Sequence, residues 1–144
     1  MYSIEEFDNA KTKILKYICF KKRTEKEIRN KFSKAIEENL LEDVIEELKE
    51  IGYINDSNYI KRALNEFMSL NNMSIKEVKY KLLTKGIKSN ILEDYISDNY
   101  DTLLEFEKKS AKRIAIKKSA LEKNEIKNYL IKKGYKEESI KEAI

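Results

Sequence analysis

One phrase recurs along this chain, and its spacing limits the possible folds more than any other feature. The phrase reads "SIKEVKYKLLTKGIKSNIL" at residues 74–92 and "KNEIKNYLIKKGYKEESI" at residues 123–140, and a looser copy, "TEKEIRNKFSKAI", starts at residue 24. The equivalent apolar residues Ile28, Val78 and Ile126 are separated by 78 − 28 = 50 and 126 − 78 = 48 residues. A repeat near fifty residues predicts an array of similar small units.

Each repeat contains three stretches in which apolar residues recur every three or four positions, the period of one face of an α-helix. Proline is absent from the 144 residues and glycine occurs only three times, which favours helix over sheet. The pattern predicts nine helices in the order long, short, short, repeated three times. Their apolar stripes begin at Phe7, Ile28, Leu41, Tyr59, Val78, Ile91, Leu103, Ile126 and Ile140.

The predicted fold is all-α, an elongated tandem array of three three-helix modules. The module boundaries that we expect are residues 1–54, 55–99 and 100–144. A helix of about 12 residues is marginally stable alone in water, so each module must bury its apolar stripes among its own three helices. An extended array of this kind suits a long partner better than a small enclosed substrate.

The ends of the repeated helices carry recognisable signals. Thr24 with Glu27, and Ser74 with Glu77, have the spacing of a capping box, in which the hydroxyl and the carboxylate each accept a hydrogen bond from a free amide of the first turn. The third copy has Glu122 at the position of the hydroxyl. Each helix that starts with these residues in the second and third copies ends near a glycine, Gly86 or Gly134, where a left-handed backbone is expected.

Several classes of function lack the residues they need. Histidine is absent, which removes the commonest general base and the commonest metal ligand. The three glycines are isolated, so no phosphate-binding loop is formed, and Cys19 is the only cysteine. We therefore expect no catalytic residue, no cofactor and no metal site. The acidic N-terminus and the lack of a long apolar run predict a cytoplasmic protein without a membrane partner.

The formal charge of +4 is small, but its distribution is uneven. Residues 11–34 hold ten Lys and Arg against two acids, whereas residues 35–56 hold one lysine against eight acids. A second basic segment, "KKSAKRIAIKK" at residues 108–118, places Lys109, Arg113 and Lys117 on one edge of a helix. This edge is either an ordinary solvated face or a contact surface for phosphates or an acidic protein groove; membrane binding is a weaker third reading.

Nine tyrosines raise the possibility of base stacking. Tyr17, Tyr59, Tyr80, Tyr95 and Tyr129 lie on or beside apolar stripes, however, and burial of the ring with its hydroxyl at the rim is the usual use of tyrosine there. We expect these rings, and Cys19, to pack within the modules.

Four phrases in this order resemble the RecX family of regulatory proteins, which modulate the RecA recombinase. The phrases "KRTEKEIRNKF", "LKEIGYINDSNYIKRAL", "SIKEVKYKLLTKGI" and "IKNYLIKKGYKEESIKEAI" are similar to successive family phrases. The resemblance as a whole extends over roughly residues 10–144. One departure is "LNNMS", which stands where the family often has a glycine. The resemblance implies tandem three-helix modules and a non-catalytic protein of recombination, DNA repair and the SOS response.

The resemblance also implies a partner, the RecA filament on DNA, whose ATPase and strand-exchange activities family members lower. Some members also bind DNA. We expect a monomer that contacts RecA, and possibly single- or double-stranded DNA, through cations because arginine and lysine pair with phosphates and carboxylates. The expected contact residues are Lys22, Arg23, Arg29, Lys109, Arg113 and Lys117.

The sequence favours two other classes of function less. A three-helix unit with a tight turn resembles a helix-turn-helix, but the helix after Gly86 carries Glu93, Asp94, Asp98 and Asp101, which repel phosphate. Contact with the phosphate backbone by other helices, without RecA, remains the alternative. An enzyme is the third and least favoured class.

Overall fold

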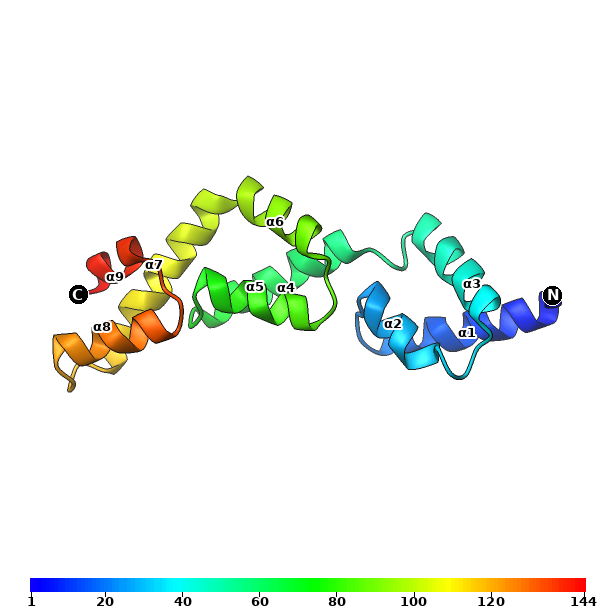
Figure 1. Ribbon diagram of the computed structural model, residues 1–144, viewed down its shortest axis with the longest axis horizontal. Coiled ribbons are helices and arrows are strands. Elements are labelled where there is room, and N and C mark those ends of the chain that lie inside the picture. Colours follow the sequence, from blue (N-terminus) through cyan, green and yellow to red (C-terminus); the bar gives the residue numbers. More distant parts are fainter. The chain divides into compact units, whose positions relative to one another are not determined.

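The computed structural model describes all 144 residues and contains nine α-helices and no strand (Figure 1). The all-α prediction and the order of one long helix followed by two shorter ones are confirmed. The helices are α1 (Ile4–Phe20), α2 (Glu25–Phe32), α3 (Glu38–Glu50), α4 (Asp56–Leu70), α5 (Ile75–Thr84), α6 (Ser89–Asp98), α7 (Tyr100–Lys117), α8 (Lys123–Lys132) and α9 (Glu137–Ala143).

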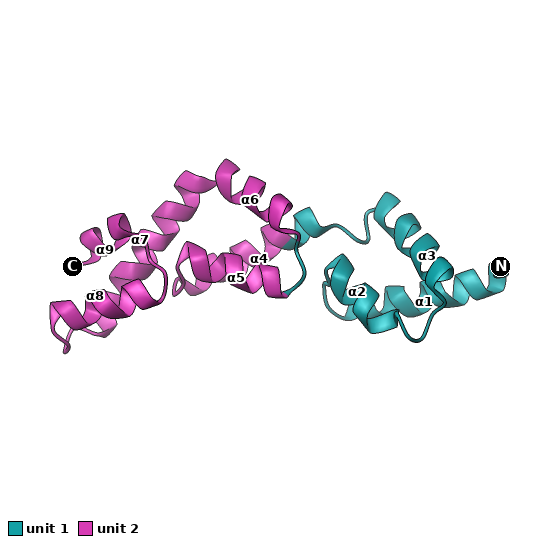
Figure 2. Cartoon of the chain, viewed as in Figure 1, with its two compact units in different colours: residues 1–59, 85–87 teal, residues 60–84, 88–144 magenta.

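The chain forms two compact units, coloured separately in Figure 2. Unit 1 comprises Met1–Tyr59 together with Lys85–Ile87, and unit 2 comprises Ile60–Thr84 together with Lys88–Ile144. The three module boundaries expected from the repeat stay a prediction.

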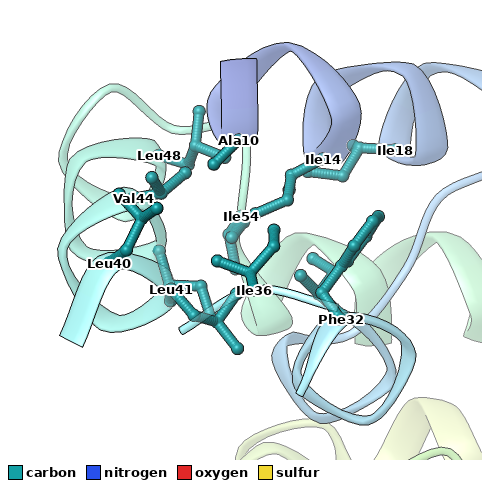
Figure 3. Close-up of a cluster of buried hydrophobic side chains, with 12 residues drawn as sticks. Ala10, Ile14, Ile18, Phe32, Ile36, Leu40, Leu41, Val44, Leu48 and Ile54 are labelled. Carbon is teal, nitrogen blue, oxygen red and sulfur yellow. The ribbon is translucent and has the colours of Figure 1, made fainter. Parts of the chain in front are cut away.

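Unit 1 is built around one apolar cluster from α1, α2 and α3 (Figure 3). Ile14 of α1 and Val44 and Leu48 of α3 are completely buried. Two residues outside the helices, Ile36 and Ile54, close the cluster. The stripes predicted from the three- and four-residue period therefore meet one another, and their burial supplies the main stabilisation.

Unit 2 contains a cluster formed by Ala111, Ile126, Leu130, Tyr135 and Ile140, to which α7, α8 and α9 contribute. Burial raises the pKa of the Tyr135 hydroxyl above its ordinary value. The helices α4, α5 and α6 bury Ile60, Leu64, Val78, Leu82 and Leu92.

Both predicted capping boxes are present. The Thr24 and Ser74 hydroxyls each accept a hydrogen bond of 3.1 Å from the amide three residues later, and the glutamate there accepts one from the cap amide. Glu122, the residue in the third copy, makes no side-chain capping bond. Gly86 and Gly134 have φ of +94° and +88°, which confirms the left-handed turns that follow α5 and α8.

Asn71, just after the end of α4, has a left-handed backbone. Its φ is +54°, and asparagine tolerates this left-handed conformation better than most residues with a side chain. The turn at "LNNMS" therefore closes without a glycine.

Two packing predictions were wrong. Tyr80 is 69% exposed and Cys19 is exposed, although both lie beside an apolar stripe in the sequence. Tyr17, Tyr59, Tyr95 and Tyr129 are half-buried. The helical period places a residue on the border of a stripe, but it does not show how far the neighbouring helix extends over that border.

Candidate partner-binding surfaces

The predicted basic edge of α7 is exposed. Lys109, Arg113 and Lys117 are all accessible and take part in no ion pair, while Ala111 of the same helix is completely buried. The expected separation of a cationic edge from an apolar face is therefore present. Because no acid of the chain pairs with these three side chains, their charges are available to a partner.

Arg113 and Lys109 also border a hollow in unit 2 with a volume of about 540 Å³. One guanidinium nitrogen of Arg113, Nη1, donates a hydrogen bond of 2.8 Å to the backbone carbonyl of Leu70. This contact fixes one end of the guanidinium and leaves its remaining donors available. The other residues around the hollow are Met68, Ser69, Asn71, Thr102, Glu105 and Phe106.

The predicted contact residues of unit 1 differ in availability. Lys22 is exposed without an ion pair. Arg23 is half-buried, with its guanidinium carbon 4.2 Å from the centre of the Tyr17 ring, a cation–π contact. These two cations lie between α1 and α2, at the turn where the chain enters the second helix.

Arg29 is already engaged within unit 1. Its two terminal nitrogens donate to both oxygens of Glu42, at 2.6 and 3.0 Å, and its Nε donates to Glu25 at 3.0 Å. Glu42 accordingly raises the pKa of the Arg29 guanidinium above its ordinary value. A partner would have to compete with a bidentate carboxylate for this side chain.

The charge separation along the sequence is partly neutralised in the folded unit. Lys11 pairs with Glu47 at 2.8 Å, and Arg29 pairs with Glu42, so cations of α1 and α2 meet acids of α3. The basic segment 11–34 therefore does not form one free cationic surface. Lys22, Arg23 and Arg29 belong to unit 1, whereas Lys109, Arg113 and Lys117 belong to unit 2, so the six do not form one site within a unit.

The sequence interpretation missed Glu107, a completely buried carboxylate on α7. One of its oxygens accepts a hydrogen bond of 3.0 Å from the Ile75 amide, and the other accepts bonds from the Ser139 hydroxyl at 2.6 Å and the Lys136 amide at 3.3 Å. These donors lie at the start of α5 and of α9. The signal was present in the sequence, because Glu107 lies four residues after Leu103 and four before Ala111, on the apolar face.

A related contact occurs in unit 1. Asp56, the first residue of α4, accepts a hydrogen bond of 3.0 Å from the amide of Glu25, the first residue of α2. The cap hydroxyls have a second role as well: Thr24 donates to the Lys85 carbonyl at 2.6 Å, and Ser74 donates to the Lys133 carbonyl at 2.7 Å. In both units the start of a middle helix is thus completed by residues far downstream.

Three or more side chains of the metal-binding types do not come together anywhere in the structure. No helix combines the length and the apolar character that a membrane span requires.

Comparison with known proteins identifies the family. No family model matches the chain. The chain is 33% identical over 143 residues to the regulatory protein RecX of Finegoldia magna, an alignment that covers 94% of this chain and 70% of that protein. It is 36% identical over 151 residues to the regulatory protein RecX of Clostridium beijerinckii, which covers 97% of this chain and 68% of that protein.

The chain belongs to the RecX family. The crystal structure of RecX from Lactobacillus salivarius superimposes with a TM-score of 0.80 and 28% identity, over 96% of this chain and 94% of that one. A second RecX crystal structure, at 18% identity, shares the fold with a TM-score of 0.76 over 94% of this chain and 71% of that one. The resemblance carried by the four sequence phrases is confirmed. RecX proteins are named as regulatory proteins, and regulation is the level of function that family membership supports.

Proposed function

We propose that this RecX-family protein binds the RecA filament on DNA and lowers its ATPase and strand-exchange activities in recombination and DNA repair. The protein acts as a cytoplasmic monomer, by binding and without catalysis or a cofactor. Membership in the RecX family is the observation that supports this proposal most directly.

The exposed basic edge of α7 is the proposed contact surface. Its three cations are free of ion pairs within the chain, so binding a carboxylate or phosphate there breaks no existing pair. At about 1.5 Å per residue, the 18 residues of α7 span about 27 Å. The cationic edge itself, from Lys109 to Lys117, spans about 12 Å of this helix at about 1.5 Å per residue. On a rigid helix it can contact more than one group of a regular polymer such as a filament. Lys22 and Arg23 in unit 1 are proposed as secondary contacts.

The proposal is tested by titrating the protein into RecA ATPase assays on single-stranded DNA. The variant Lys109→Glu/Arg113→Glu/Lys117→Glu should inhibit at least about tenfold more weakly than the wild type, because three attractions become repulsions. Its helical circular dichroism should be unchanged, since all three side chains are exposed. A variant with the same change of charge elsewhere in unit 2, Lys61→Glu/Arg62→Glu/Lys123→Glu, should inhibit like the wild type.

Unchanged inhibition by the first variant would remove the α7 edge from the mechanism. A wild-type protein without any effect on RecA, but with salt-sensitive binding to bare single-stranded DNA, would favour the alternative of direct phosphate contact. The acids of α6 argue against base reading by that helix, since Glu93, Asp94 and Asp98 are all exposed.

A further inference from the structure

A second surface of unit 2 shares no residue with the basic edge of α7. The helix α5 and the end of α8 with its following turn enclose a hollow with a volume of about 300 Å³, which we call the α5–α8 groove. It is lined by Lys76, Glu77, Tyr80 and Lys81 of α5, and by Ile131, Lys132, Lys133 and Gly134.

The rim of the groove is cationic and available. Four lysines face one glutamate around it, and none of the four ammonium groups takes part in an ion pair. The single carboxylate, Glu77, already accepts a hydrogen bond from the Ser74 amide at 3.1 Å as part of the capping box. Two of the lysines lie near aromatic rings, with Lys81 Nζ 5.7 Å from the centre of Phe67 and Lys133 Nζ 5.7 Å from the centre of Tyr129.

The same groove exposes apolar side chains. Tyr80 is 69% exposed and Ile131 is 53% exposed, and both line the hollow. Apolar contacts at the centre with polar and charged groups around them are the usual anatomy of a protein interface. Gly134 contributes to the shape, because a Cβ built there would lie 2.9 Å from Cδ of Lys76. The missing side chain thus leaves room for the Lys76 stem beside the groove.

The chemistry of the groove favours an acidic peptide over a nucleic acid. A single strand of nucleic acid is held by successive aromatic faces that stack on successive bases. The groove offers only one exposed aromatic ring, Tyr80, and its other exposed apolar side chain, Ile131, is aliphatic. No arginine lines the groove to make a bidentate phosphate contact. A volume of about 300 Å³ is at the small end of ligand pockets, which suits one large apolar side chain better than a run of bases.

We propose that the α5–α8 groove binds a short acidic segment of a partner protein. A large apolar side chain of that segment enters between Tyr80 and Ile131, and its carboxylates pair with the surrounding lysines. This inference goes beyond the proposed function and does not depend on the α7 edge.

The test uses fluorescence anisotropy with the full chain and three labelled probes. The first probe is an acidic peptide of Asp and Glu with one central Phe, the second has Ala in place of Phe, and the third is an oligothymidylate of similar length. The wild type should bind the Phe peptide more tightly than the other two. The variant Lys81→Glu/Lys132→Glu should weaken binding of the Phe peptide by about tenfold or more, because two attractions become repulsions.

Two further variants make the result specific to the groove. Lys123→Glu/Lys127→Glu carries the same change of charge on exposed residues of α8 that do not line the groove, and it should bind the Phe peptide within about twofold of the wild type. Tyr80→Ala should lower the affinity for the Phe peptide to that for the Ala peptide. Because Tyr80 is mostly exposed, this variant should keep its helical circular dichroism.

Four outcomes would overturn the proposal. The first two are that the wild type does not bind the Phe peptide, or that it binds the Phe and Ala peptides equally. The third is an equal loss of affinity for the Phe peptide in the two lysine variants. The fourth is that the wild type binds the oligothymidylate more tightly than the Phe peptide and that Lys81→Glu/Lys132→Glu abolishes this binding. The last result would assign the groove to single-stranded nucleic acid instead.

Discussion

Glu107 shows what one buried residue does in this fold. A carboxylate away from water is costly unless it is hydrogen-bonded, and Glu107 accepts three hydrogen bonds while being completely buried. Two of its donors are free backbone amides at the starts of α5 and α9, where a negative charge is also favoured by the helix dipole. The residue therefore connects three helices of unit 2.

We expect Glu107→Ala to lower the free energy of unfolding substantially. Each buried donor left without a partner costs about 1–3 kcal/mol, and the Ile75 amide and the Ser139 hydroxyl both lose theirs. The urea midpoint measures the change. Glu105→Ala is the control, because Glu105 lies on the same helix with 68% of its side chain exposed and only a distant ion pair of 3.9 Å to Lys108. Equal midpoints for the two variants would contradict the structural role of Glu107.

At the scale of the element, two neighbouring leucines of α5 are the same residue type but differ in burial. Leu82 is 1% exposed and Leu83 is 37% exposed. Leu82→Ala leaves a cavity and should cost about 2–5 kcal/mol of unfolding free energy, whereas Leu83→Ala should cost much less because its side chain already contacts water. Urea unfolding of both variants checks this, and a midpoint that hardly moves for Leu82→Ala would disprove the placement of α5 in the core.

The contact of α2 with α3 should make stability depend on pH in acid. Burial alone would raise the pKa of Glu25, but hydrogen bonds from Lys49 and Arg29 outweigh it and lower that pKa below 4.5, and Arg29 likewise lowers the pKa of Glu42. A lowered folded-state pKa stabilises the protein above the unfolded value of 4.5. That stabilisation is lost as the pH falls through the folded-state pKa.

The free energy of unfolding should therefore decrease between pH 7 and about pH 3, and it should decrease less in Arg29→Met. Urea midpoints at the two pH values measure both changes. Lys34→Met removes a nearby exposed cation without an ion pair, so it should keep the wild-type difference. If Arg29→Met loses as much stability in acid as the wild type, the ion pairs of Arg29 are not the source.

The helices could be predicted from the sequence because their stripes repeat with a clear period, and the two capping boxes because their residues are local. Tyr80 and Glu107 could not be placed in the same way. Whether a border residue such as Tyr80 is covered depends on helices from elsewhere in the chain. The helical period does place Glu107 on the apolar face of α7, but its three donors come from the starts of α5 and α9, and the period contains no information about them.

At the scale of the whole molecule, the net charge of +4 describes binding capacity poorly. In unit 1 several cations are already paired within the unit: Lys11, Arg29 and Lys49 form ion pairs with acids of α2 and α3. Unit 2 leaves the cations of the α7 edge and of the α5–α8 groove unpaired. The sequence predicted the α7 edge because its three cations are regularly spaced in an acid-free segment. The groove was not predicted, because it combines α5 with a turn more than forty residues further along the chain.

The downstream partners of the α2 and α5 caps have a consequence for a chain that is still being translated. Synthesis proceeds from the N-terminus. The carbonyl that accepts the hydrogen bond of the Ser74 hydroxyl belongs to a residue 59 positions later, and the one that accepts from Thr24 comes 61 positions later. On the ribosome α2 and α5 can each form their own first turn. The Thr24 and Ser74 hydroxyls, however, donate to water until Lys85 and Lys133 of the following repeat have emerged. Maturation of the fold therefore lags synthesis by about one repeat.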